Sequence, residues 1–177
     1  YKRATACGLT SSEPLEALVR LEAAVTPAMA ADLEGVELDF AGLLERARDL
    51  AAGADVTIVE GVGGLLAPLT WRHNTSDLAR ELEASVILVA SDRLGTINHT
   101  LLTLAGLASF RVDALVLSAP EVPDASTGTN AEAIRMHAGA LGIAVPPIVV
   151  LDRIESLDEA AAELGDLAAA LVGGVWV

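Results

Sequence analysis

Apolar and polar positions divide the chain into two kinds of segment. Short apolar runs rich in β-branched residues predict strands at 55–59, 85–90, 112–117 and 147–151. Elsewhere apolar positions recur at helical spacing, which predicts helices at 40–52, 76–83, 97–109, 130–141 and 157–171. Thr75 and Ser156 stand before two of these helices, where each hydroxyl is expected to cap the first turn.

The predicted strands are apolar on both faces and alternate with helices through short connections. This order is typical of an α/β fold, with a parallel β-sheet flanked by helices on both sides. The 177 residues contain no long linker and no repeat, so we expect a single domain over residues 1–177. In such sheets ligands bind beyond the carboxyl ends of the strands, so functional residues are expected there.

Composition narrows the range of functions. Hydrophobic residues make up 53% of the chain and aromatic residues only 3%, which predicts an aliphatic core. The net charge of −14 argues against binding to a nucleic-acid backbone, and the apolar runs are too short to span a membrane. Cys7 is the only cysteine, which excludes an internal disulfide and favours a reducing, cytoplasmic location. No Cys/His cluster has zinc-site spacing, and no G-x-S-x-G motif of a serine hydrolase occurs.

The segment 56–70 carries the first candidate site. Its apolar run ends at Glu60, and Gly61, Gly63 and Gly64 follow in a glycine-rich turn. A carboxylate at the end of a strand can bind Mg²⁺, and glycines let backbone N–H groups approach a ligand. The alternative is an ordinary strand end with a tight turn and a solvated Glu60.

A second candidate site lies in the segment 86–100, where a strand leads through Gly95 into a helix that starts near Thr96 to Asn98. The free N–H groups and the dipole of a helix N-terminus suit a carboxylate or a phosphate. The alternative is ordinary capping by Thr96 or Asn98. Lys2 is a third candidate: it either neutralises phosphate or carbamate charge or is simply a terminal lysine.

Four motifs occur along the chain in this order: Tyr-Lys, Val-Thr-Pro, Val-Glu-Gly-x-Gly-Gly-Leu-x-x-Pro-Leu and Leu-Gly-Thr-Ile-Asn-His-Thr-Leu-Leu-Thr. The series resembles the dethiobiotin synthetase family, most clearly from Tyr1 to about Leu117. The resemblance implies a P-loop NTPase-like three-layer sandwich that usually works as a homodimer. It also implies an enzyme of biotin biosynthesis that uses ATP, Mg²⁺ and CO₂ to close the ureido ring of dethiobiotin on 7,8-diaminopelargonic acid.

The same resemblance implies roles for the residues that match the motifs. Lys2 would stabilise the carbamate and the transferred phosphoryl group, and Glu60 would bind magnesium at the nucleotide. The substrate's carboxylate would bind at the helix N-terminus near Asn98, at or across the dimer interface. The matching substrate-binding positions are Cys7, Pro27, Gly63, Gly64, Gly95, Thr96, Ile97 and Asn98, and the nucleotide-binding positions are Glu60, Ser118, Ala119 and Pro120.

The sequence also departs from the family pattern. No G-x-x-x-x-G-K-[ST] motif occurs and the first residue is Tyr1, so we expect the phosphate-binding loop in a preceding segment, with activity once that segment is present. Cys7 stands where the family usually has Ser or Thr, and Ser118 where many members have the asparagine that reads adenine. Two alternatives stay open: a non-catalytic substrate-binding relative, and another P-loop amidoligase or partitioning-type ATPase.

Overall fold

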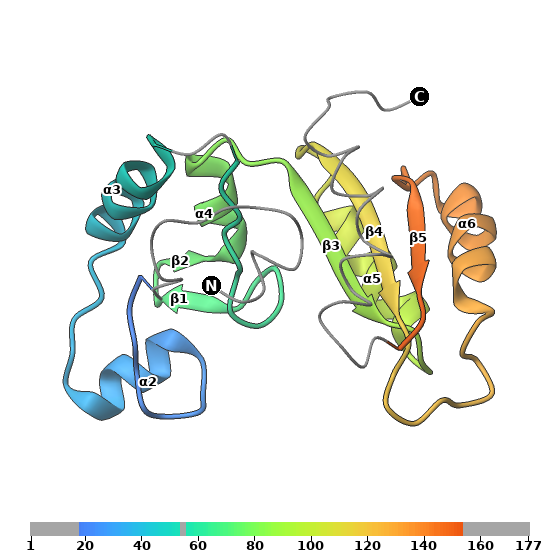
Figure 1. Ribbon diagram of the computed structural model, residues 1–177, viewed down its shortest axis with the longest axis horizontal. Helices are drawn as coiled ribbons and strands as arrows, with labels where there is room; N and C mark the ends of the chain where they lie inside the picture. The colour runs from blue at the N-terminus through green and yellow to red at the C-terminus, as the bar shows by residue number, and fades with distance from the viewer. Residues whose placement is uncertain (1–17, 54–55, 154–177) are drawn as a thin grey trace. The chain divides into compact units, whose positions relative to one another are not determined.

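The computed structural model describes residues 18–53 and 56–153. The chain forms two compact units, the first ending at Ala84 and the second beginning at Ser85 (Figure 1). The expectation of a single domain over residues 1–177 stays a prediction. Lys2, Cys7, Ser156 and the predicted helix 157–171 lie outside the described residues. Among the helices that the structure describes, none has the length and apolar character needed to cross a bilayer.

The second unit is built on a parallel three-stranded sheet in the order β3-β4-β5 (Figure 1). A crossover helix joins each strand to the next, as parallel pairing requires. This arrangement confirms the predicted α/β fold with a parallel sheet and flanking helices, while the expectation of helices on both sides of the sheet stays a prediction. The elements are β3 Val86–Ser91, α5 Thr96–Gly106, β4 Val112–Ser118, α6 Asn130–Leu141 and β5 Ile148–Leu151.

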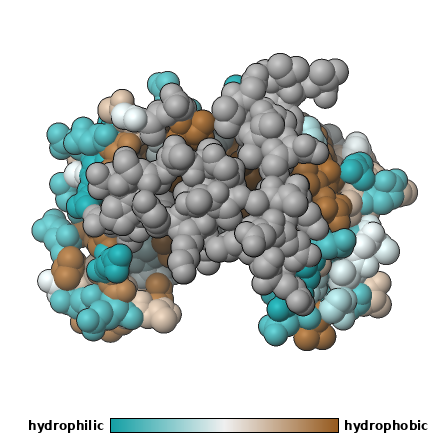
Figure 2. Space-filling model, viewed as in Figure 1, coloured by the Kyte–Doolittle hydropathy of each residue, from teal (hydrophilic) through white to brown (hydrophobic). Residues whose placement is uncertain are grey.

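The core of this unit joins both helices to the middle strand. Leu101 of α5, together with Ile134 and Ala138 of α6, packs in one cluster with Leu115 and Leu117 of β4. Because side chains two apart on a strand share a face, α5 and α6 cover the same face of the sheet. Leu115, Leu117 and Ile134 are each 0% exposed, and burying one such side chain stabilises the fold by about 1.5–3 kcal/mol. Figure 2 shows that apolar side chains also reach the surface, as brown areas between hydrophilic teal ones.

The first unit is built from shorter strands than the second and has its own core. Its described residues form a two-stranded antiparallel ladder and three helices, and Phe40, Leu44, Leu69 and Leu78 form a buried cluster. The strands were not predicted because elements this short show no periodicity. The elements are α2 Pro27–Glu34, α3 Phe40–Ala51, β1 Pro68–Thr70, β2 His73–Asn74 and α4 Thr75–Glu81.

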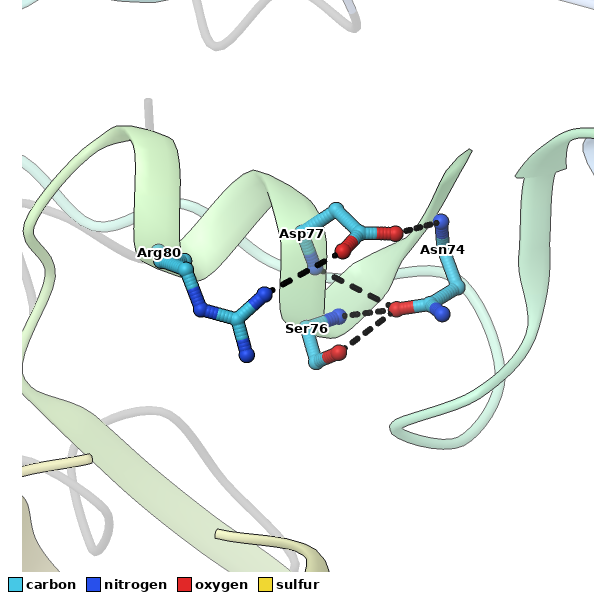
Figure 3. Close-up of polar contacts among 4 residues, drawn as sticks. All are labelled: Asn74, Ser76, Asp77 and Arg80. Carbon is cyan, nitrogen blue, oxygen red and sulfur yellow. Dashed lines mark hydrogen bonds and ion pairs between the residues drawn. The ribbon is translucent and has the colours of Figure 1, made fainter. Parts of the chain in front are cut away.

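Helix α4 begins one residue earlier than predicted, and its cap is Asn74 rather than Thr75. The side-chain oxygen of Asn74 accepts hydrogen bonds from the N–H groups of Ser76 (2.8 Å) and Asp77 (3.2 Å) (Figure 3). Asp77 completes a capping box, since its carboxylate accepts the N–H of Asn74 at 2.9 Å. Arg80 lies 3.3 Å from the other oxygen of Asp77. The Thr75 hydroxyl is buried and has no hydrogen-bond partner among the described residues.

The predicted strand 55–59 is wrong where the structure describes it. Residues 56–60 have no regular secondary structure, and Val56, Ile58 and Val59 are 45%, 76% and 41% exposed. A strand exists only when its N–H and C=O groups pair with a neighbour, and no described residue supplies that neighbour. An apolar β-branched run is therefore not sufficient for a strand here.

Candidate functional site

The turn between β3 and α5 presents a helix N-terminus without a side-chain cap. Gly95 is the N-cap residue with a φ of 95°, a left-handed conformation that glycine adopts without strain. Neither Thr96 nor Asn98 caps the helix, so the capping alternative is wrong. Thr96 is buried, Ile97 packs against the core, and Asn98 is exposed. The N–H of Thr96 donates to the carbonyl of Arg93 at 3.1 Å. The N–H groups of Ile97 and Asn98, together with the helix dipole, suit a carboxylate or a phosphate.

The exit of β4 lies beside this turn. Ser91 pairs with Ser118 at the ends of the strands, and the N–H of Asp92 donates to the carbonyl of Ser118 at 2.8 Å. The N–H of Ala119 donates to the carbonyl of Leu151 at 3.0 Å. The structure therefore brings together two predicted groups, the one at Gly95 and the one at Ser118, Ala119 and Pro120. Their shared position at the carboxyl ends of parallel strands agrees with the general rule for ligand sites.

Asp92, which the sequence analysis did not single out, joins this region to the loop that follows β4. It is 2% exposed and accepts hydrogen bonds from the N–H of Gly128 (2.8 Å) and from Nδ2 of Asn130 (2.6 Å). The hydroxyl of Thr127 donates to the Asp92 carbonyl at 2.9 Å. A buried carboxylate needs such donors, because an unpaired charge inside the protein is costly. Asp92 follows β3 directly, so the strand-end rule would have found it.

Asp124 makes a second connection between the same two loops. Its carboxylate accepts the N–H of Leu94 at 2.8 Å, and also the N–H and the hydroxyl of Ser126 at 2.8 and 2.6 Å. These hydrogen bonds lower the pKa of Asp124 from 3.8 to about 2. The bond from Leu94 is the largest cause, and the bonds from Ser126 follow. The pattern Asp-x-Ser is typical of a turn that Asp closes with its own side chain, and this signal could have identified Asp124 from the sequence.

The glycine-rich turn belongs to the first unit. Glu60 is exposed, and a Cβ atom added at Gly61 would lie 2.6 Å from Cγ2 of Thr75. Gly63 has a φ of 78°, and a Cβ there would lie 3.0 Å from Cβ of Ala67. Gly64 has open space in that direction. Glycine is therefore required at the first two positions by the fold itself, whereas Gly64 leaves its backbone accessible.

Pro27 is the first residue of α2, where its missing N–H costs nothing. It is half-buried, and next to it a groove of about 300 Å³ is lined by residues that include Ala28, Ala31 and Trp71. The indole N–H of Trp71 donates to Asp32 at 2.9 Å, which fixes one wall of this groove. The lining is mixed, because Asp32, Glu37 and Thr70 lie in it beside the apolar residues.

Glu60 is a single candidate metal ligand. Within residues 18–53 and 56–153, no three His, Cys, Asp or Glu side chains gather closely enough to hold a metal ion. Mg²⁺ commonly binds through one or two carboxylates together with nucleotide phosphates and water. An exposed Glu60 beside a glycine turn fits that mode, in which the nucleotide supplies the other ligands.

Comparison with known proteins agrees with the motifs. A family described as an AAA domain matches residues 2–161. The chain is 44% identical to the ATP-dependent dethiobiotin synthetase BioD of Aromatoleum aromaticum over 139 residues, which are 73% of this chain and 58% of that protein. It is 41% identical to BioD of Pseudomonas aeruginosa over 140 residues (77% and 58%), and 46% identical to BioD of Anaeromyxobacter sp. over 110 residues (61% and 48%). The resemblance is confirmed, and the chain spans about half of the length of these relatives.

Proposed function

The chain belongs to the AAA-domain family, and from this premise we propose that the whole protein is an ATP-dependent dethiobiotin synthetase. It closes the ureido ring of dethiobiotin from 7,8-diaminopelargonic acid and CO₂, in biotin biosynthesis. The observation that carries the proposal is the uncapped first turn of α5 behind Gly95. A substrate with a carboxylate at one end matches that turn in charge and in hydrogen-bonding capacity.

The proposed substrate contacts are the positions that match the family motifs. Gly95, Thr96, Ile97 and Asn98 bind the substrate carboxylate, with the exposed amide of Asn98 as a further donor. The two glycines 63 and 64 bind the diamine and carbamate end, and Pro27 lies against the aliphatic chain.

The nucleotide contacts involve the exit of β4 and the glycine turn. Ser118, Ala119 and Pro120 contact the base, and Glu60 binds Mg²⁺ at the phosphates. When bound, Mg²⁺ neutralises phosphate charge during phosphoryl transfer. Lys2 stabilises the carbamate and the transferred group.

The carbamate is phosphorylated, and the second amine nitrogen then attacks the carbamoyl carbon, so that a C–N bond forms and phosphate leaves.

We also propose a homodimer in the cytoplasm. On α5, Leu101 and Leu104 are buried in the unit's own core, whereas Leu102 is 65% exposed. An exposed leucine on this helix supports a contact with a second copy. Sedimentation equilibrium of Leu102→Glu tests this, since a charge at an apolar interface shifts the protein towards monomer, and an unchanged mass would contradict the contact.

The activity is tested on the full-length protein with 7,8-diaminopelargonic acid, bicarbonate and Mg-ATP, by mass spectrometry of dethiobiotin. In Asn98→Asp a carboxylate faces the substrate's own, and the KM for the diamine rises by about tenfold or more. Ala105→Asp is the matched control, because it adds the same charge at an exposed position farther along α5. Diamine binding without product would identify a non-catalytic relative, and neither binding nor product would refute the proposal.

A further inference from the structure

Two loops of the second unit are joined by bonds that span 30 to 38 positions of sequence. One loop runs from β3 to α5 and ends at Gly95, and the other follows β4. Asp92 joins them at the base through Gly128 and Asn130. Asp124 joins them farther out, through the N–H of Leu94.

The Asp124 contact is closest to the proposed carboxylate site. Leu94 directly precedes Gly95, whose left-handed φ sets the direction in which α5 begins. The side chain of Leu94 is 82% exposed, so packing does not hold this residue in place. The hydrogen bond from its N–H to a charged acceptor therefore constrains the peptide before the helix from outside the turn, in addition to the turn's own bond from the N–H of Thr96 to the carbonyl of Arg93 (3.1 Å). Such charge-assisted bonds are about twice as strong as neutral ones.

We infer that Asp124 is a positioning residue for substrate recognition: it fixes Leu94, and thereby aims the N-terminal N–H groups of α5 at the substrate's carboxylate. The inference rests on the proposed function. It separates the two ends of the substrate, because Asp124 acts through the first turn of α5 on the carboxylate end. It also assigns the loop after β4 a role in substrate recognition, in addition to the proposed contact of its first residues with the nucleotide.

Binding of two probes to the full-length protein tests this role by calorimetry. One probe is 7,8-diaminopelargonic acid, and the other is 2,3-diaminooctane, the same chain without its carboxyl group. In Asp124→Ala the acid binds about tenfold more weakly, as expected when helix N–H groups lose their aim, and the binding of 2,3-diaminooctane is unchanged. Asp124→Asn keeps one side-chain oxygen, so its affinity for the acid is expected to lie between that of Asp124→Ala and that of the wild type.

Ser126→Ala is the matched control. It removes the hydroxyl that donates to Asp124 at 2.6 Å but leaves the bond from Leu94 in place. Weakening of the acid's binding in Asp124→Ala, but not in Ser126→Ala, supports the positioning role. Equal weakening of both probes, or equal effects of both substitutions, would mean that Asp124 serves only the stability of its own loop and would overturn the inference.

Hydrogen exchange keeps this inference distinct from the proposed function. If the wild-type protein binds neither probe, the proposed function fails. Exchange at the amides of Leu94, Ile97 and Asn98 in the ligand-free protein then still reports on the contact. Faster exchange at these amides in Asp124→Ala than in Ser126→Ala supports the structural role of Asp124, and unchanged exchange removes it.

Discussion

The turn before α5 and the glycine turn after Glu60 are both predicted ligand sites, but they are supported in different ways. Around the first, Asp92 and Asp124 bind the backbone of neighbouring loops through charged side chains. Around the second, the preceding residues 56–60 form no regular structure, and short backbone bonds such as Ala67 N–H to the Gly64 carbonyl (3.0 Å) shape the turn. The first site is thus held by charged side chains of neighbouring loops, whereas the second is held by backbone bonds, including one from the N–H of Ser76 to the carbonyl of Leu65 (3.0 Å).

The sharpest way to break this comparison is to make the same deletion in both regions. Ile134→Ala removes a side chain that is 0% exposed, and the cavity is expected to cost about 2–5 kcal/mol in the free energy of unfolding. Ile58→Ala removes one that is 76% exposed and is expected to cost less than about 0.5 kcal/mol. Urea denaturation of both variants measures the difference. Equal losses would mean that residues 56–60 are packed as a strand after all.

The next largest effect concerns the buried carboxylate. Asp92→Ala leaves the N–H of Gly128 and the amide of Asn130 without their acceptor, which is expected to cost about 2–3 kcal/mol in the free energy of unfolding. Glu132→Ala is the control, since its side chain is 72% exposed and lies 3.7 Å from Arg135. Such a surface pair contributes less than about 1 kcal/mol. A similar loss of stability in both variants would contradict the role of Asp92 in joining the two loops.

A smaller effect separates the observed cap of α4 from the predicted one. Asn74→Ala removes two accepted N–H bonds and is expected to cost about 1 kcal/mol. Thr75→Val keeps the shape and removes only a buried hydroxyl that has no partner among the described residues, so the stability should change little. Thermal unfolding of the two variants distinguishes them. A larger loss of stability in Thr75→Val than in Asn74→Ala would indicate that Thr75 caps the helix.

The smallest expected effect is a change in stability at acidic pH, and it concerns Asp124. The pKa of Asp124 is lowered from 3.8 to about 2, so the folded protein favours its charged form. The stability that the ionised Asp124 contributes to the folded protein is fully present above the ordinary pKa and is lost as the pH falls from about 4 towards 2. The difference in unfolding midpoint between the wild type and Asp124→Asn should therefore be constant from pH 5 to 7 and shrink below about pH 4. A difference that persists unchanged at about pH 2 would contradict the lowered pKa.

The sequence pattern predicted the second unit well because its signals are local. The strands at β3, β4 and β5 and the helix Asn130–Leu141 appear where periodicity placed them, and Gly95 lies at the helix start that the motif suggested. The contacts that join loops distant in sequence were not predicted, because no local pattern shows which backbone N–H will meet Asp92 or Asp124. Pairing is likewise non-local, which is why the run 56–59 was mistaken for a strand.

The register of the sheet has a further consequence, for the speed at which this unit forms. Val86 pairs with Val112, and Leu115 pairs with Ile148, so each pairing closes a loop that contains an entire helix. Closing such loops costs chain entropy before any strand contact repays it, and parallel sheets therefore fold slowly. We expect α5 and α6 to reach helical structure early and the sheet to assemble in the rate-limiting step, during which the apolar edge of β3 is open to association with other chains.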